Sequence, residues 1–182
     1  MTHPVANFLA FQLCWFSNVF GAARGWVWLG PTVALVWIAI HIGWQRPFPR
    51  AEVALLLTAG VIGYSADSLL VLSGLLAFPE SSRLGGPSPM WMVCLWIGFG
   101  ATFAHSLNWL RRRLVLAVAL GAIAGPLAYL AGQSIGALSL TSRESLIAVG
   151  IQYAIATPLL FKLLGVAERL WQPHHVSTEG QQ

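Results

Sequence analysis

Six long apolar stretches, separated by short polar turns, constrain what this chain can fold into. A helix that crosses a bilayer needs about 20 mostly apolar residues, and each of the six stretches approaches or exceeds that length. Only 9% of the 182 residues are charged, against about 25% in soluble domains. The sequence therefore predicts an all-α, polytopic membrane protein with a six-transmembrane-helix bundle. The predicted spans are residues 5–23, 28–44, 52–78, 88–110, 114–138 and 144–164.

The domain organisation follows from the same pattern. Residues 1–171 form one transmembrane helical domain, and the polar tail at 172–182 is predicted to be cytoplasmic and disordered. Ser88 followed by Pro89 is typical of a helix start, and the spacing of Thr141 and Glu144 is that of a capping box. A cleaved signal peptide over the first span is an alternative. It is disfavoured because no Lys or Arg precedes the span and polar residues interrupt it.

The orientation is predicted from the Lys and Arg residues in the turns. Seven lie on one side of the six-span arrangement and three on the other, so the seven-charge side is predicted to be cytoplasmic, with both termini there. The seven are Arg46, Arg50, Arg111, Arg112, Arg113, Lys162 and Arg169. Tryptophans are expected at both interfaces: Trp44, Trp109 and Trp171 on the inner side, Trp26, Trp28 and Trp91 on the outer.

Asp67 is the one charged residue that this arrangement leaves inside the membrane. A carboxylate there costs at least about 2.5–3.5 kcal/mol, so it needs a partner, a water-filled cavity or a proton. Glycines on the same helical face predict that Asp67 faces another helix and not lipid. The candidate buried polar site consists of Asp67, Tyr64, Asn18, Gln133 and Gln152, with Tyr129 also within reach.

Two interpretations of Asp67 stay open at this stage. In the first, Asp67 carries a proton or binds a cation in a polar pocket. In the second, it hydrogen-bonds Asn18 or Tyr64 and only joins helices, which adds little stability because such contacts average about 0.6 kcal/mol.

A second polar layer is predicted near the cytoplasmic side, formed by His41, His105 and Asn108. His41 and His105 lie at similar depth, so a shared metal or acid–base site is one interpretation. The other is that both are interfacial histidines close to water. Because no third acidic or cysteine ligand is expected at that depth, the sequence predicts no metal and no cofactor.

Other features point to packing and topology. The glycine-rich stretch with Pro126 is either a gate or a tightly packed central helix. Arg111 to Arg113 either bind a phosphate headgroup or act as a cytoplasmic stop signal. The basic residues are scattered between apolar runs, so the pI of about 9.7 indicates contacts with anionic lipid and not with nucleic acid. Neither Cys14 nor Cys94 lies in a CxxC motif or beside histidines, so the sequence contains no local zinc motif.

Four stretches together resemble an uncharacterised family of short bacterial inner-membrane proteins, the domain-of-unknown-function family 2878. They are residues 7–16, residues 63–74, the run His105-Ser106-Leu107-Asn108-Trp109-Leu110, and residues 125–137 from Gly125-Pro126 through Gly136-Ala137. The resemblance implies a multi-pass protein of the bacterial inner membrane. It also implies a lipid-linked role, because similar proteins tend to be encoded near lipid-modifying enzymes such as cyclopropane-type fatty-acyl methyltransferases.

Three functions remain in competition, and the sequence does not decide whether any of them is enzymatic. The first is a small-solute or proton-linked transporter that uses Asp67. The second is an accessory protein or enzyme of fatty-acyl modification, with His105, Asn108 and Asp67 lining a groove. The third is a structural or assembly partner without a ligand. Membrane lipids and other membrane proteins are the expected partners.

Overall fold

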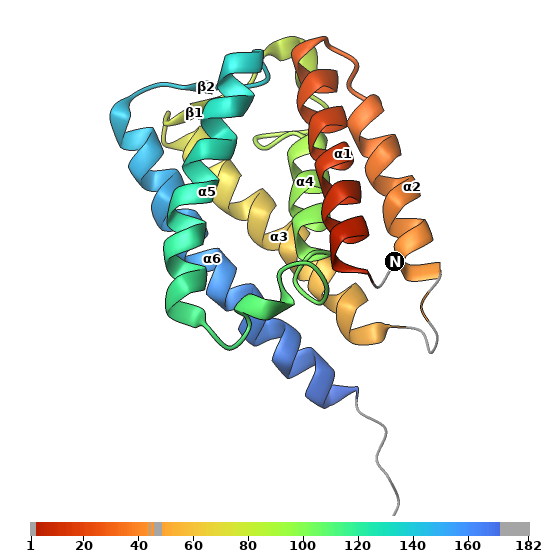
Figure 1. The fold of residues 1–182 in the computed structure, drawn as a ribbon. Helices are drawn as coiled ribbons and strands as arrows, with labels where there is room; N and C mark the ends of the chain where they lie inside the picture. Colours follow the sequence, from red (N-terminus) through yellow and green to blue (C-terminus); the bar gives the residue numbers. More distant parts are fainter. Residues whose placement is uncertain (1–2, 44, 46–48, 172–182) are drawn as a thin grey trace, which may run out of the picture.

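The computed structural model describes residues 3–43, 45 and 49–171, in which six α-helices alternate in direction to form one bundle (Figure 1). Their bounds are α1 Pro4–Ala23, α2 Leu29–Gly43, α3 Arg50–Leu72, α4 Met90–Gly100, α5 Leu114–Ile135 and α6 Arg143–Leu170. Two 3₁₀ turns, η1 (Glu80–Ser82) and η2 (Asn108–Leu110), and two short strands, β1 (Leu76–Ala77) and β2 (Ser139–Leu140), complete the described part. Trp44 and the predicted tail at 172–182 lie outside the described residues.

Four of the helices, α1, α3, α5 and α6, are long and apolar enough to cross a membrane. The other two, α2 and α4, are apolar but shorter, at 15 and 11 residues. The all-α prediction is therefore confirmed, together with the presence of helices compatible with a membrane.

The predicted span at 52–78 is too long at its end. Helix α3 ends at Leu72, and the chain then turns into β1, which pairs antiparallel with β2. The Thr141 hydroxyl donates a hydrogen bond to the carbonyl of Gly74 at 2.7 Å. This short ribbon joins the turn after α3 to the turn after α5, at the upper left in Figure 1, and so satisfies backbone groups that a longer helix would have paired internally.

The predicted continuous span at 88–110 is also wrong. Helix α4 ends at Gly100, and residues 101–107 form a series of turns before η2. The Thr102 hydroxyl donates to the carbonyl of Phe99 at 2.6 Å, next to the end of the helix. Side-chain hydrogen bonds of this kind compete with helical backbone bonds, and hydropathy alone does not register them.

The ends of α5 and α6 show ordinary capping chemistry. Helix α5 stops at Gly136, whose φ of 90° is a left-handed conformation that glycine adopts at no steric cost. Helix α6 begins with a capping box between Ser142 and Ser145. The predicted box between Thr141 and Glu144 is thus displaced by one residue. Pro126 and Pro158 both lie inside helices.

The bundle interior is aromatic, and its outer surface is apolar. Trp91, Trp96 and Phe103 are among the largest fully buried side chains, so Trp91, predicted at the outer interface, faces the bundle interior. Trp26, Trp28, Trp109 and Trp171 are exposed. Many large aliphatic side chains on the helices also face outward, including Leu35, Leu72 and Val115, as expected for helices in contact with lipid.

Contact between α3 and α4 depends on Gly63. A Cβ atom placed there would lie 1.9 Å from the Trp96 side chain, a distance that no real contact allows. The glycine on α3 therefore makes the space in which the Trp96 indole packs.

We expect Gly63→Ala to lower the free energy of unfolding by at least about 1–3 kcal/mol, the usual effect of overpacking. The matched control is Gly150→Ala on α6, where the nearest atom to an added Cβ is 3.3 Å away. Thermal unfolding of the two variants in detergent, followed by tryptophan fluorescence, compares them. Equal midpoints would contradict the packing described for Trp96.

Candidate functional site

Asp67 lies in the centre of the bundle and accepts hydrogen bonds from three other helices. Its side chain is on α3 and has no exposed surface. Oδ2 accepts from the Trp96 indole of α4 at 2.8 Å. Oδ1 accepts from the Tyr129 hydroxyl of α5 at 2.5 Å and from the Gln152 amide of α6 at 2.7 Å. One carboxylate therefore links α3 to α4, α5 and α6.

These three hydrogen bonds stabilise the buried carboxylate of Asp67. Burying a charge without partners is costly, and hydrogen bonds to its oxygens offset that cost. The three donors are neutral, so the cluster carries a single negative charge when Asp67 is ionised. Trp96 is held in turn by stacking on Tyr153, with ring centroids 4.7 Å apart.

The structure brings only one member of the predicted polar site, Gln152, into contact with Asp67. The Tyr64 hydroxyl instead donates to the carbonyl of Gly86, and its side chain is exposed. The Asn18 amide donates to the carbonyls of Cys14 and Gly30. Gln133 accepts a hydrogen bond from the backbone of Leu140. Each of these three residues thus supports local structure at another place in the bundle.

Two Asp67 partners were underrated or missed by sequence reasoning. Tyr129 was predicted only to lie at a depth from which it could reach Asp67. Trp96 was not predicted as a partner, because a tryptophan in an apolar helix is usually a packing residue. The opposing Gly63 was the available clue, since a glycine on a helix face indicates that something large approaches it.

An elongated cavity of about 530 Å³ lies beside this cluster, between α1, α4 and α5, with α6 contributing to its wall. In Figure 1, α1 and α5 stand on either side of α4. We call this space the α1/α4/α5 cavity. Its lining on α5 runs from Leu120 to Gly132, a length of roughly 18 Å at 1.5 Å per residue. Tyr129 belongs both to this lining and to the Asp67 cluster.

Two buried polar atoms in the cavity lining have no hydrogen-bond partner among the described residues. They are the Trp91 indole nitrogen and the Thr157 hydroxyl. Trp91 stands near the β1 end of the bundle, where it meets Phe78 edge to face. Thr157 lies beside Gly121, toward the other end. An unmatched buried polar group usually indicates an absent water or ligand.

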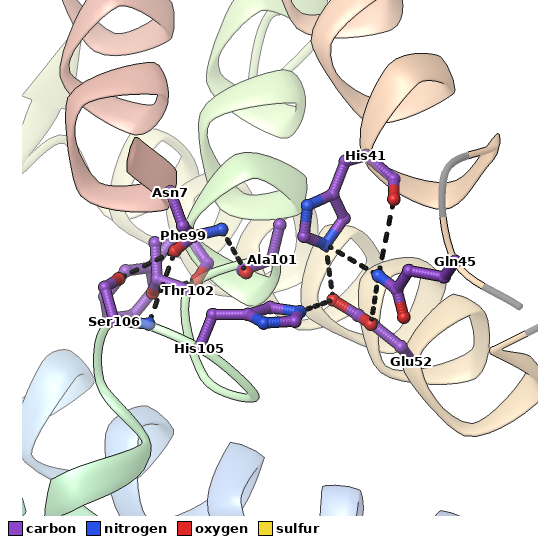
Figure 2. Close-up of polar contacts among 9 residues, drawn as sticks. All are labelled: Asn7, His41, Gln45, Glu52, Phe99, Ala101, Thr102, His105 and Ser106. Carbon is purple, nitrogen blue, oxygen red and sulfur yellow. Dashed lines mark hydrogen bonds and ion pairs between the residues drawn. The ribbon is translucent and has the colours of Figure 1, made fainter. Parts of the chain in front are cut away.

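A second polar cluster joins α2, α3 and the turn after α4 (Figure 2). Glu52 Oε1 lies 2.5 Å from His41 Nε2 and 3.0 Å from His105 Nε2. The Gln45 amide donates to Glu52 Oε2 at 2.8 Å. His41 is fully buried, Glu52 is 5% exposed, and His105 is partly buried. We call these four residues the His–Glu cluster.

The turn that carries His105 is fastened to α1 by Asn7 (Figure 2). The buried Asn7 amide donates to the carbonyl of Ala101 at 3.0 Å, and its oxygen accepts from the Ser106 hydroxyl at 2.7 Å. The non-helical residues 101–107 are therefore anchored on both sides of His105, which fixes where the imidazole points.

The predicted polar layer of His41, His105 and Asn108 is only partly assembled. His41 and His105 meet, with ring centroids 4.8 Å apart, but Asn108 is exposed on η2. The expectation that no acidic ligand lies at their depth is wrong, because Glu52 Oε1 contacts Nε2 of both rings. The sequence prediction placed Glu52 at the end of the span 52–78 and left Asp67 as the one charged residue inside the membrane.

Arg111 forms an ion pair with Glu168, to which it donates two hydrogen bonds. This pair ties the start of α5 to the end of α6. Of the Arg111–Arg113 group, the first residue thus has a structural role. The cysteines Cys14 and Cys94 are both free thiols.

Comparison with known proteins identifies the family. The profile described as "Protein of unknown function (DUF2878)" matches residues 4–159, which is most of the chain and includes both polar clusters. The chain belongs to the DUF2878 family. No curated protein and no solved structure matches this DUF2878 protein significantly. Its function must therefore be argued from its own residues.

Replacing Tyr129 with Phe tests the Asp67 cluster. The change removes one of the two donors to Oδ1, and we expect it to lower the free energy of unfolding by about 1.5–3 kcal/mol, the range for a hydrogen bond to a charged group. Tyr64→Phe removes the same hydroxyl from an exposed site on the same protein, and we expect an effect below about 1 kcal/mol. Thermal unfolding in detergent measures both. A larger loss in Tyr64→Phe than in Tyr129→Phe would contradict the assignment of Asp67 partners.

Proposed function

We propose that this DUF2878 protein is a multi-pass membrane protein that binds one chain of an amphipathic lipid in the α1/α4/α5 cavity. The observation that carries the proposal is a long apolar cavity lined by two buried polar atoms, the Trp91 indole nitrogen and the Thr157 hydroxyl, that have no hydrogen-bond partner among the described residues.

The size and composition of the cavity support a lipid chain. Small-molecule sites occupy about 300–1,000 Å³ and are lined mainly by apolar and aromatic side chains. The volume of about 530 Å³ falls in this range, and the lining includes Phe11, Trp15, Phe99 and Leu127. An elongated slot parallel to the helices suits an extended acyl or isoprenoid chain better than a compact polar solute.

The position of the lining residues supports access from the bilayer. Phe16 on α1 and Leu127 on α5 both line the cavity and are also exposed on the outer face of the bundle. Helices α1 and α5 make few direct contacts with each other, whereas α5 packs along most of α6. A chain can therefore enter sideways between α1 and α5 without crossing a polar surface.

The unmatched indole of Trp91 supports an ester or hydroxyl group on the ligand. Trp91 is almost completely buried, and a buried N–H without an acceptor is destabilising by about 1–3 kcal/mol. A lipid carbonyl or hydroxyl oxygen at that end of the cavity would accept this hydrogen bond. The Thr157 hydroxyl offers a second polar contact deeper in the slot.

Lipid binding is favoured over proton-linked transport through Asp67. Both carboxylate oxygens already accept hydrogen bonds from Trp96, Tyr129 and Gln152, and the side chain has no exposed surface. A proton carrier needs a path to each side of the membrane, and nothing in this cluster favours one. Asp67 instead positions Tyr129, which forms part of the cavity wall.

The proposal includes a location and an orientation. The protein would lie in the inner membrane of a bacterium, cross it six times and keep both termini inside. Helix α4, at 11 residues, spans roughly 16 Å and cannot cross alone. Its crossing would be completed by residues 101–110, whose irregular backbone is tolerated at depth because neighbouring helices cover it.

We expect Ala128→Phe to displace the lipid, because Ala128 lines the cavity and the larger side chain would fill it. The measurement is native mass spectrometry of the full-length protein released from mild detergent, followed by lipid analysis of the bound fraction. The wild type should retain about one lipid per chain, and Ala128→Phe should lose most of it.

The matched control is Ile123→Phe, about one and a half turns away on α5, whose side chain is exposed and does not line the cavity. It should retain the lipid of the wild type. Trp91→Phe, which removes the indole N–H together with part of the ring, should weaken retention by at least about tenfold. The proposal fails if the wild type carries no lipid, or if Ala128→Phe and Ile123→Phe retain equal amounts.

A reporter fusion tests the orientation. With six crossings and an internal N-terminus, alkaline phosphatase joined after residue 140, between α5 and α6, should be active because it lies outside the cytoplasm. A green fluorescent protein fused to the C-terminus should be fluorescent in the cytoplasm. An inactive phosphatase at residue 140 would contradict the proposed topology.

A further inference from the structure

We infer that the His–Glu cluster is a binding site for a divalent transition-metal cation, with His41, Glu52 and His105 as ligands. This inference is independent of the lipid cavity, because the two sites share no residue.

The geometry of the three ligands supports a cation. The ligating atoms of His41, Glu52 and His105 all lie within 4.8 Å of one another. Atoms bound to the same tetrahedral zinc lie roughly 3.3 Å apart, given metal–ligand distances of about 2.0–2.2 Å. Small side-chain rotations are therefore enough to place one cation between the two imidazole Nε2 atoms and the carboxylate.

The donor set selects the class of metal. Two imidazole nitrogens and one carboxylate suit Zn²⁺ and the neighbouring divalent transition metals. Mg²⁺ and Ca²⁺ prefer sites built from oxygen alone. The single carboxylate leaves one positive charge on a bound dication.

Gln45 offers a fourth ligand. Its amide nitrogen lies 2.8 Å from Glu52 Oε2 and 3.3 Å from His41 Nε2. When His41 Nε2 donates its proton to Glu52, the contact between the two nitrogens is not a hydrogen bond. Turning the amide by 180° would bring the Gln45 oxygen to the same place, where it can bind the cation beside Glu52.

The backbone around His105 is held by specific hydrogen bonds, which supports a preformed binding site. Helix α4 stops at Gly100, and Asn7 holds the turn on both sides of His105 through Ala101 and Ser106. A helix that continued would not need these side-chain hydrogen bonds. The interruption thus places an imidazole opposite a buried glutamate and a buried histidine (Figure 2).

The site is also accessible at one edge. The side chain of His105 is 11% exposed and that of Glu52 is 6% exposed, whereas that of His41 is fully covered. A cation would reach the cluster from the His105 side, at the end of the bundle where α2 ends and α3 begins. Bound there, it would join α2, α3 and the turn after α4.

The experiment is zinc titration of the purified full-length protein in detergent. Every protein carries His174→Ala and His175→Ala, because this adjacent pair in the sequence would bind metal by itself. After removal of metal with a chelator, competition with a chromophoric zinc indicator gives the affinity, and elemental analysis gives the stoichiometry. Mg²⁺ and Ca²⁺ serve as comparison cations.

We expect one Zn²⁺ per chain and no measurable competition from Mg²⁺ or Ca²⁺. Glu52→Gln and His105→Gln should each weaken zinc binding by at least about 100-fold, because each removes a ligand, whereas outer-sphere changes alone cost about 10–100-fold. Asn108→Ala, at an exposed neighbouring residue, should leave the affinity within about threefold of the parent protein. Less than one Zn²⁺ per chain in the parent, or equal affinities in the parent and Glu52→Gln, would overturn the assignment.

A second measurement keeps the test decisive when a variant fails to fold. Co²⁺ bound to the parent protein should show the visible absorption bands of tetrahedral coordination by nitrogen and oxygen, and Zn²⁺ should abolish them. A parent protein that shows no such bands would overturn the assignment just as firmly. In that event His41, Glu52 and His105 would be a hydrogen-bonded cluster only.

Discussion

The rest of the bundle depends on how the buried Asp67 carboxylate is satisfied. Its oxygens accept hydrogen bonds from α4, α5 and α6, so four helices meet at one side chain of α3. In an apolar interior, an unpaired carboxylate would be far costlier than the sum of these contacts suggests. The geometry therefore allows few alternatives: Gly63 must stay small for Trp96 to approach, and Tyr129 must point toward α3. Packing between the helices is specified by polar contacts, as expected where lipid removes most of the hydrophobic driving force between helices.

This constraint separates the bundle into two regions with different chemistry. On one side, α5 is held against α6 and away from α1, which leaves the α1/α4/α5 cavity with its unmatched Trp91 and Thr157. At the end of the bundle where α2 meets α3, the interrupted α4 places His105 against Glu52 and His41. The cavity is apolar and long, whereas the His–Glu cluster is compact and rich in metal ligands. The two regions share the bundle but no residues, so a lipid and a cation could be bound independently.

Hydropathy patterns were sufficient to predict the helical class and the burial of Asp67, because these depend on local composition. They were insufficient to predict contacts between side chains that lie far apart in the sequence. Asn18 was expected beside Asp67, but its amide donates to the carbonyls of Cys14 in its own helix and of Gly30 instead. Glu52 looks like a surface residue beside Arg50, yet two histidines from other elements enclose it. The break after Gly100 depends on Asn7, 94 residues away from Ala101, which no window along the sequence can detect.

The most direct test of lipid binding is to ask which residues a lipid chain touches in the membrane. A fatty acid carrying a photoreactive diazirine can be incorporated into the lipids of the expressing cells and crosslinked to the protein before purification. Peptide mass spectrometry then locates the crosslinks. The account predicts that they concentrate on the cavity lining, at Phe11, Trp15 and Phe16 of α1 and at Leu120, Ala124 and Ala128 of α5. Crosslinks spread evenly over the exposed faces, including Ile147 and Ile155 of α6, would contradict it.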